Sequence, residues 1–447
     1  MTRRWVSHVA RAGAVATLLG FTLAGAGRVA ARPAHAPVTV QIWWSDWGHP
    51  WTDLMVKATD TLYHKEHPDI TVKWTFFPNI SQKLLTTAAA GTVPDVAYTN
   101  SSICLPWAIR GALQPLTPYI KNSKLDLSKF APAVLPYYTW NGTVWALPTD
   151  NDDTALSWNK DAFKAAGLNP NQPPRTIADI DRLNARLFTY DAHKNIVRAG
   201  FFPDTLGFQY WGLAFGGSFY DTAHHKITAN DPHNVQALQW LIHEAQTWGG
   251  ADKEDRFRGA YAGSASPADP FYTGRVAMSP RGFWEFNTMQ KFVPKTQFGF
   301  APYPIVPSVG PRYWVTGTWG EVIPKGSAHP QAGWDLAYWM TATPDSGKVL
   351  ADTLNLNAYL PVLDQWYTET MKLVGSHSSR AYMKVWPQNI VPNTKSIAYA
   401  TPVNDYYDST LAREVTKALH GKETAQQALD TVTTQVQAQL DGVLTKR

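Results

Sequence analysis

Strand-like and helix-like segments alternate at the beginning of the globular part of the chain. Val38, Val40 and Ile42 occupy every second position, which is typical of a half-buried strand. A helical spacing then ends at Pro68, and a second strand-like run covers residues 70–76. The same alternation repeats once more. Parallel strands require helical crossovers of this kind, so the pattern predicts a doubly wound α/β sheet.

Polar and aromatic residues follow the first and third of these strands. In open α/β sheets, ligands bind outside the carboxyl ends of the strands. We therefore expect ligand contacts at this edge of the sheet, from Trp43, Asp46, Trp47, Asn100 and Ser101. Strand alternation places Trp44 toward the core and Trp43 away from it. For Asp46, capping of a helix is an alternative role.

The first 36 residues have the three parts of a secretory signal peptide. Arg3 and Arg4 form a basic start, an apolar run covers residues 12–26, and small residues end at Ala36. The apolar run is too short to span a membrane comfortably. We therefore expect cleavage after Ala36 and export by the Sec or twin-arginine route.

The charge balance gives no reason to expect a nucleic-acid partner. The chain carries 40 Lys and Arg against 35 Asp and Glu, but five of the arginines and none of the acids lie in residues 1–36. The remainder has 35 of each sign. A neutral exported chain lacks the basic surface that nucleic acids require.

The only cysteine, Cys104, has no intrachain partner and lies far from the signal peptide. We expect it to be a small buried side chain, and we expect the protein not to be a lipoprotein. The sequence contains no Walker loop, HExxH or GxSxG motif. No metal, nucleotide or other cofactor is therefore expected.

The rest of the chain is rich in helical patterns. Residues 235–248 form one amphipathic stretch in the middle region. Near the end, Thr424 and Gln427 match a capping box that opens a final helix. No long linker separates independent modules, so we expect any lobes to be interleaved in the sequence.

Seven segments resemble a known family in their residues and in their order. They include Gly282-Phe-Trp284 and Gly317-Thr-Trp-Gly320, and they cover residues 39–44, 83–96, 142–148, 156–168, 271–284, 298–304 and 317–325. Together they resemble the extracytoplasmic sugar-binding proteins of bacterial ABC importers, the family that includes the maltose-binding protein.

The resemblance implies a two-lobe, periplasmic-binding-protein-like (Venus flytrap) fold. Each lobe would be a doubly wound α/β sheet, the C-terminus would be helical, and the lobes would close over a ligand by a hinge motion. The first lobe would comprise residues 37–149 and 304–356, and the second residues 150–303 and 357–447.

The resemblance also implies residues for the ligand site. Asp152 matches a ligand-binding carboxylate, and Trp284 matches a tryptophan that stacks on the sugar. Tyr210 and Trp211 fall near a second aromatic contact, and Tyr407 falls near a third. One departure is Thr99-Asn-Ser-Ser102, which replaces an aromatic residue and an Asp-Arg pair of the maltose-binding protein, so maltose itself is not implied.

Further candidates follow from the chemistry of sugars. Aromatic rings suit the C–H faces of a sugar, and carboxylates suit its hydroxyl groups. Asp150 and Glu285 supply carboxylates beside the residues above. Trp319 lies between two glycines, which allow a close approach of the backbone.

The predicted function is capture of a mono- or oligosaccharide and its delivery to the membrane permease of an ABC transporter. The protein would act as a monomer in the periplasm or at the outer face of the cell, without catalysis. A secreted glycoside hydrolase is an alternative, since Asp150, Asp152, Asp153 and Glu285 could supply the two carboxyl groups it needs. Two further alternatives concern other ligands. The acidic run at residues 150–153 could bind a polyamine, and Tyr406-Tyr407 could bind ferric ion.

Overall fold

The computed structural model describes residues 37–46, 48–49, 51–203, 207–261, 266–353, 355–373, 383, 394–396 and 399–445. The predicted signal peptide and Trp47 lie outside the described residues. The chain from Pro37 onward forms one compact unit. In its described part, no helix combines the length and the apolar character needed to cross a membrane.

One sheet of this unit has five strands: β1 (Val38–Ser45), β2 (Ile70–Phe77), β3 (Val96–Asn100), β6 (Leu147–Pro148) and β15 (Trp319–Val322). Their order is β2-β1-β3-β15-β6. β1 pairs in parallel with β2 and β3, as the alternating pattern predicts. β15 arrives from much later in the chain and runs antiparallel to β3 and β6.

Helices lie around this sheet. They are α1 (Trp51–Ala58), α2 (His64–Glu66), α3 (Ile80–Ala89), α4 (Ser101–Ile109), α5 (Thr117–Ser123), α12 (Pro330–Ala342) and α13 (Pro344–Asp352). Trp44 is fully buried, as predicted. The prediction that Trp43 faces away from the core is wrong, because only 8% of it is exposed and its ring packs against Phe77. Both faces of β1 are covered, so strand alternation does not separate buried from exposed positions here. Cys104 is buried on α4, as predicted.

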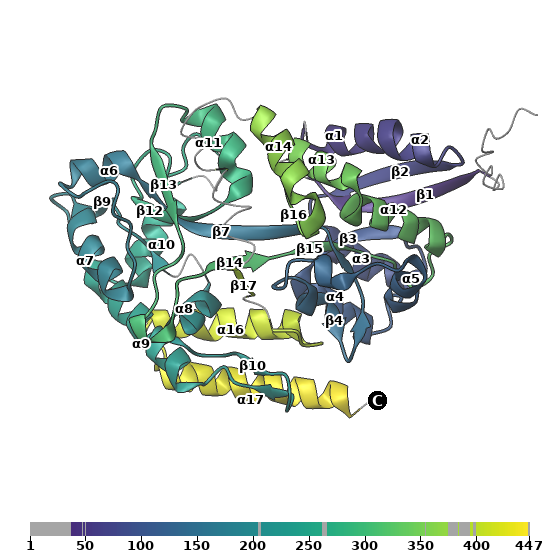
Figure 1. Ribbon diagram of the computed structural model, residues 1–447. Helices are drawn as coiled ribbons and strands as arrows, with labels where there is room; N and C mark the ends of the chain where they lie inside the picture. Colours follow the sequence, from purple (N-terminus) through teal and green to yellow (C-terminus); the bar gives the residue numbers. More distant parts are fainter. Residues whose placement is uncertain are drawn as a thin grey trace, which may run out of the picture. The chain divides into compact units, whose positions relative to one another are not determined.

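The second sheet is built around one long strand, β7. Its members are β7 (Asp150–Asn159), β12 (Met278–Gly282), β13 (Phe298–Ala301), β14 (Trp314–Gly317), β16 (Leu356–Asn357) and β17 (Thr394–Ser396). β12, β13, β14 and β16 all pair antiparallel with β7, and β17 pairs with β14. β7 is the central pairing partner of this sheet (Figure 1).

The remaining elements surround the second sheet or form short hairpins. The helices are α6 (Lys160–Ala165), α7 (Ile177–Leu187), α8 (Phe208–Phe215), α9 (Pro232–Trp248), α10 (Ala251–Gly259), α11 (Phe286–Phe292), α14 (Leu363–Leu373), α16 (Asn404–Leu419) and α17 (Ala425–Leu444). The hairpin strands are β4 (Thr139–Trp140), β5 (Thr143–Val144), β8 (Thr189–Tyr190), β9 (Ile196–Arg198), β10 (Tyr220–Asp221) and β11 (Lys226–Ile227).

The C-terminal helices confirm the local predictions. Thr424 and Gln427 form the predicted capping box at the start of α17, each side chain accepting the other's backbone N–H. α17 packs along α16, and both contact α9. α14 packs on α13, which shows that the helices after residue 357 do not all gather around α16. The division of the chain into lobes at the predicted residues stays a prediction.

The chain crosses between the two sheets at two neighbouring points. β6 ends at Pro148 and β7 begins at Asp150, while β14 ends at Gly317 and β15 begins at Trp319. A single residue separates the strands at each point. The fold therefore brings Asp150 and Trp319 together where the sheets meet.

Candidate functional site

Asp150 holds the two crossings together. Its carboxylate accepts hydrogen bonds from the Tyr98 hydroxyl at 2.6 Å and from the backbone N–H of Trp319 at 3.0 Å. The Thr318 hydroxyl donates to the backbone oxygen of Asp150 at 2.6 Å. Only 1% of Asp150 is exposed. Both carboxylate oxygens of Asp150 thus accept hydrogen bonds from the protein itself. In this structure the side chain stabilises the crossing between the two sheets.

Asp152 and Thr154 share the face of β7 to which Asp150 belongs, because side chains alternate along a strand. Asp152 lies opposite Gly317 of β14, and Thr154 lies opposite Gly282 of β12. Neither glycine adds a side chain to this face. No side chain of β14 therefore lies opposite Asp152, and none of β12 lies opposite Thr154, whereas Val315 of β14 lies opposite Thr154 on its other side.

Trp284 lies over the same face. A Cβ atom on Gly282 would come within 2.2 Å of the Trp284 ring, so the indole rests directly on the backbone opposite Thr154. Among the described residues, Trp284 is also one of the few large hydrophobic side chains that are exposed, with 39% of its surface accessible. The exposed indole of Trp284 and the half-buried carboxylate of Asp152 thus lie on the same face of the second sheet.

Trp319 forms the outer member of an aromatic stack. Its ring lies parallel to that of Tyr98 at 4.9 Å, and Tyr98 lies parallel to the fully buried Trp44 at 3.8 Å. The Trp319 side chain also hydrogen-bonds to Asp152. The stack fixes the Trp319 ring, and the hydrogen bond places that ring beside the carboxylate.

Burial sets the protonation of these acids. It raises the pKa of Asp152 to about 6, and the hydrogen bond from Trp319 opposes the rise. Burial and the neighbouring Asp152 also raise the pKa of Asp150. Asp152 is therefore mostly ionised at neutral pH and can accept hydrogen bonds from hydroxyl groups.

Asp153 lies on the opposite face of β7. It is fully buried, and neither of its carboxylate oxygens has a hydrogen-bond partner. Thr316 on β14 is close enough to lower the pKa of Asp153. Its hydroxyl nevertheless donates its hydrogen bond to the backbone oxygen of Gly317. Burial raises the pKa of Asp153 to about 8, so this carboxyl group is mostly protonated at neutral pH.

Tyr210 belongs to the same group of residues as Asp152. It hydrogen-bonds with Thr154, and its ring meets that of Tyr303 edge-on at 5.5 Å. Burial raises the pKa of Tyr210 to about 12, so its hydroxyl stays protonated and can donate. The structure thus brings together Asp152, Tyr210, Trp284 and Trp319.

Trp211 and Tyr407 do not join this group. Both are fully buried in the core around α8 and α16. The Trp211 indole donates to the backbone oxygen of Pro203, and the Tyr407 hydroxyl donates to that of Phe219, each at 2.7 Å. Their polar atoms are satisfied within the core, and no surface is left for a ligand.

The remaining predicted residues are engaged locally. Asn100 caps α4 by accepting the backbone N–H of Ile103, and Ser101 beside it is buried. Asp46 is exposed and accepts the N–H of Gly48, which is a turn contact. Glu285 accepts hydrogen bonds from Arg281 at 2.7 Å and from Tyr272 at 3.1 Å. Arg281 is also paired through two hydrogen bonds with Asp269. Each of these side chains thus has a structural partner.

Asp408 of α16 is a hydrogen-bonded carboxylate that the sequence analysis did not name. α16 packs against α4, and there Asp408 accepts hydrogen bonds from Tyr399 at 2.9 Å, from Gln209 at 3.3 Å and from Ser102. Burial raises its pKa. The contact joins a helix of the second sheet to the first turn of α4, next to the strand that carries Trp319. No local pattern marks Asp408, because its partners come from three distant segments.

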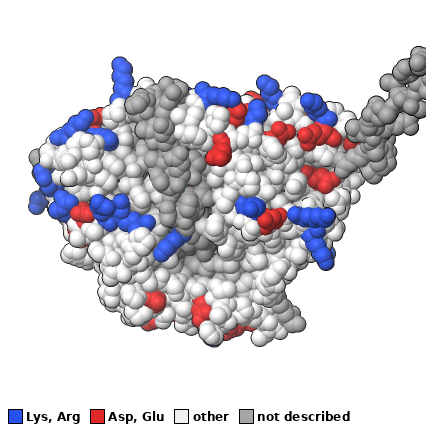
Figure 2. Space-filling model, viewed as in Figure 1, with Lys and Arg blue, Asp and Glu red and all other residues white. Residues whose placement is uncertain are grey.

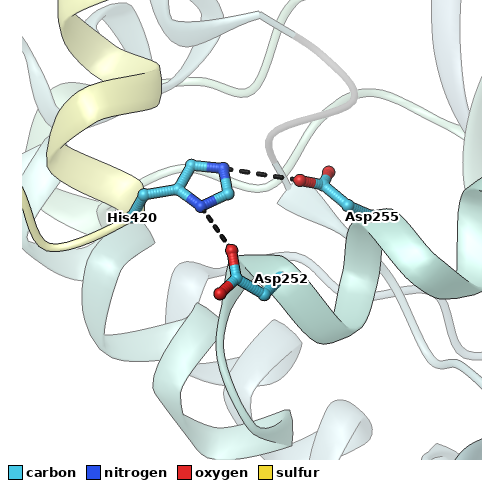
Figure 3. A group of neighbouring side chains, drawn as sticks. All are labelled: Asp252, Asp255 and His420. Atoms are coloured by element: carbon cyan, nitrogen blue, oxygen red, sulfur yellow. Dashed lines mark hydrogen bonds and ion pairs between the residues drawn. The ribbon is translucent and has the colours of Figure 1, made fainter.

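His420, Asp252 and Asp255 form the only group in the described residues with the donor set of a metal site (Figure 3). The two ring nitrogens of His420 face different carboxylates, at 2.7 Å from Asp252 and 3.4 Å from Asp255. One ion can be bound by only one nitrogen of an imidazole ring. Both aspartates are also largely exposed. The group therefore serves as a surface ion-pair bridge between α10 and the end of α16.

Comparison with known proteins identifies the family. A family model described as bacterial extracellular solute-binding protein matches residues 59–372, well over half of the chain. The chain belongs to this family. The resemblance found in the sequence is thereby confirmed. The solved structures that match the chain confirm the two-lobe α/β fold.

Related proteins differ in the ligands that their names record. The maltotriose-binding protein of Pyrococcus abyssi is 22% identical over 301 residues, which are 67% of this chain and 61% of that protein. The sn-glycerol-3-phosphate-binding periplasmic protein UgpB of Shigella flexneri serotype 5b is 25% identical over 291 residues, 61% of this chain and 62% of that protein. The match therefore spans less than two thirds of the length of these relatives.

Solved structures match over most of both chains. CpMnBP1 with bound mannobiose has a TM-score of 0.75 and 26% identity, and the match covers 89% of this chain and 99% of that one. The substrate-binding protein Lmo0181 from Listeria monocytogenes, in complex with cycloalternan, has a TM-score of 0.72 and 21% identity over 90% and 99% of the two chains.

Proposed function

We propose that this protein is the extracytoplasmic substrate-binding component of an ABC importer and that it captures a mono- or oligosaccharide. Its family supports the transport role. The mannobiose complex of CpMnBP1 and the maltotriose-binding relative support a saccharide ligand. The observation that carries the proposal is the exposed indole of Trp284 on the face of the second sheet that also carries Asp152.

The proposed site offers partners for both the C–H faces and the hydroxyl groups of a sugar. Trp284 and Trp319 offer ring faces to the C–H patches of a sugar. Asp152 accepts hydrogen bonds from hydroxyl groups, and Tyr210 donates or accepts one. A few charge-assisted hydrogen bonds and two stacked rings can supply the roughly 8 kcal/mol of a micromolar complex, an affinity that still permits release to a permease.

The disposition of the carboxyl groups supports capture rather than hydrolysis. A glycoside hydrolase needs two carboxyl groups that flank the scissile bond. Asp150 has both oxygens engaged, Asp153 points to the other face of β7, and Glu285 is paired with Arg281. Of the four carboxyl groups that the sequence offers for a catalytic pair, only Asp152 is then left for a ligand.

The other ligands considered from the sequence fit less well. Tyr407, one of the two tyrosines that suggested ferric ion, is buried with its hydroxyl bound to a backbone oxygen. The acidic run that suggested a polyamine is divided between the two faces of β7.

In transport, closure of the lobes over the sugar would present the permease with the ligand-bound form, because only differential affinity shifts a conformational equilibrium. We propose export to the periplasm or cell surface and action as a monomer.

The test is substitution of Trp284 by alanine. Trp284→Ala should abolish calorimetric binding of the oligosaccharide, among mannobiose, maltotriose and a wider panel, that stabilises the wild type most. The melting temperature without ligand should change little, since the ring is exposed. Tyr190→Ala is the matched control, because it removes an exposed ring from the β8–β9 hairpin. Unchanged affinity in Trp284→Ala would contradict the proposed site.

A further inference from the structure

Trp284 lies on a short turn that follows the second sheet. The pairing of β12 with β7 ends at Gly282, and the 3₁₀ turn η5 (Phe283–Glu285) comes directly after it. An ion pair joins the residue before this segment, Arg281, to its last residue, Glu285. Resting on the proposed function, we infer that Glu285, held by Arg281, is a positioning residue that fixes the Trp284 ring for the saccharide.

Arg281 holds two carboxylates at once. Its guanidinium donates two hydrogen bonds to Asp269, at 2.9 and 3.0 Å, and one to Glu285 at 2.7 Å. The Tyr272 hydroxyl donates to the same oxygen of Glu285 at 3.1 Å. The guanidinium also lies 4.7 Å from the centre of the Phe271 ring and 5.3 Å from that of Tyr272. Glu285 is therefore bound by two donors, and the stronger donor is itself fixed by further contacts.

Burial makes this ion-pair group different from the charges at the surface. On the molecular face in Figure 2, basic and acidic side chains are scattered among uncharged ones. By contrast, the side chains of Arg281, Asp269 and Glu285 are only 8%, 3% and 14% exposed. Buried ion pairs add little net stability, because both charges lose their hydration.

Glu285 is not needed to neutralise Arg281. Asp269 already pairs with the guanidinium through two hydrogen bonds, so Glu285 adds a second negative charge. Burial raises the pKa of Glu285, while Arg281 and Tyr272 oppose the rise. Removal of Glu285 would thus leave a complete Arg281–Asp269 pair, and the fold around it should persist.

Glu285 does not cap the helix that it precedes. It occupies the N-cap position of α11, where a side-chain oxygen normally accepts a backbone N–H of the first turn. Its side chain makes no such hydrogen bond and instead reaches back four residues to Arg281. The carboxylate therefore ties the end of η5 to the strand before it. Trp284 lies between the two tied residues.

The tie and the ring lie on different sides of the second sheet. A Cβ atom on Gly282 would meet the Trp284 ring, and Gly282 pairs with Thr154 on the face that carries the proposed site. Side chains alternate along a strand, so Arg281 points to the reverse face. A saccharide against the ring would not contact Arg281. Glu285, bound there, acts on the ligand only through the turn that carries Trp284.

The expected size of the effect follows from the ordering of one ring. Immobilising a free side chain when a ligand binds lowers affinity by a factor on the order of ten. Glu285→Ala removes the tie and should weaken saccharide binding about tenfold. Glu285→Gln keeps the length of the side chain and an oxygen that can accept from Arg281. Because a neutral acceptor is weaker than a carboxylate, this variant should remain within about threefold of the wild type.

The experiment measures affinity and ring position separately. Calorimetry with the saccharide that stabilises the wild type most would give the affinities of both variants. ¹⁹F NMR of the ligand-free protein labelled with 5-fluorotryptophan would report on the ring, with its resonance assigned through Trp284→Phe. Glu285→Ala should shift or broaden this resonance, and Glu285→Gln should restore it. A residue that serves stability alone would not move it.

Glu254→Ala is the matched control. Glu254 is a buried acid on α10 that pairs with Arg258 four residues later, at 3.4 Å. Its removal should lower the melting temperature but leave both the saccharide affinity and the Trp284 resonance unchanged. The control thereby separates loss of a buried ion pair from loss of the tie at η5.

The outcomes separate the inference from the function on which it rests. Weaker binding in Glu285→Ala together with a displaced Trp284 resonance would support the inference. Unchanged affinity, or weaker affinity with an unmoved resonance, would overturn it and leave the proposed sugar capture standing. If Glu285→Ala does not fold, Glu285→Asp, which shortens the side chain by one methylene group, carries the same expectations. A wild type that binds no saccharide would overturn both.

Discussion

Asp153→Asn should remove a defined part of the pH dependence of folding stability. Asp153 is fully buried on β7 and its carboxylate oxygens have no hydrogen-bond partner. Burial raises its pKa from 3.8 to about 8. In the unfolded chain, the same group returns to its ordinary pKa.

The sign of the effect follows from proton binding. Between pH 4 and pH 8 the folded protein keeps the Asp153 proton, whereas the unfolded chain has released it. The free energy of unfolding therefore falls as the pH rises through this range, by about 1.4 kcal/mol per pH unit. From pH 5 to pH 7 the contribution of Asp153 amounts to about 3 kcal/mol. Asparagine does not titrate, so the variant should lack this decline.

Urea unfolding followed by tryptophan fluorescence at pH 5, 6 and 7 would measure the difference. The quantity that matters is the change with pH, because the substitution also shifts stability by a constant amount that depends on how the amide is accommodated. Asp150 and Glu321 are present in both proteins, and Asp153 is the smallest of the causes that raise the pKa of Asp150, so most of their contribution cancels in the comparison. Asp60→Asn, which changes an exposed acid, should follow the wild type at each pH. Parallel curves for the wild type and Asp153→Asn would refute the reasoning.

Three further predictions follow from the site and the helix ends. Gly282→Ala should weaken saccharide binding strongly in calorimetry, because the new methyl group would lie 2.2 Å from the Trp284 ring and displace it; unchanged affinity would show that the ring position is unimportant. Saccharide affinity should fall about tenfold as the pH drops from 7.5 to 5, because Asp152 with a pKa of about 6 becomes protonated; a flat profile would argue against an ionised Asp152 in the complex. Thr424→Ala should cost about 1 kcal/mol in urea unfolding through loss of the capping box at α17, and Thr424→Ser should restore most of it.

The candidate site could be predicted only in part. Trp284, Asp152, Tyr210 and Trp319 were named from the sequence, and the structure brings them together at the crossing. Trp211 and Tyr407 have the same residue types and lie in similar sequence surroundings, yet both are buried. Composition cannot separate these cases, because the exposure of an aromatic ring depends on which distant segments pack over it.

The local elements were determined by the sequence itself. The alternating residues of β1 and β2, the helical spacing of α9 and the capping box at Thr424 are readable because their interactions join neighbours along the chain. Only the tertiary structure decided that β15 pairs with β3, that Trp43 is buried, and that Asp408 accepts hydrogen bonds from Ser102 and Gln209. These features arise from contacts between residues that are distant in the sequence, and no short-range pattern encodes which face of a strand remains uncovered.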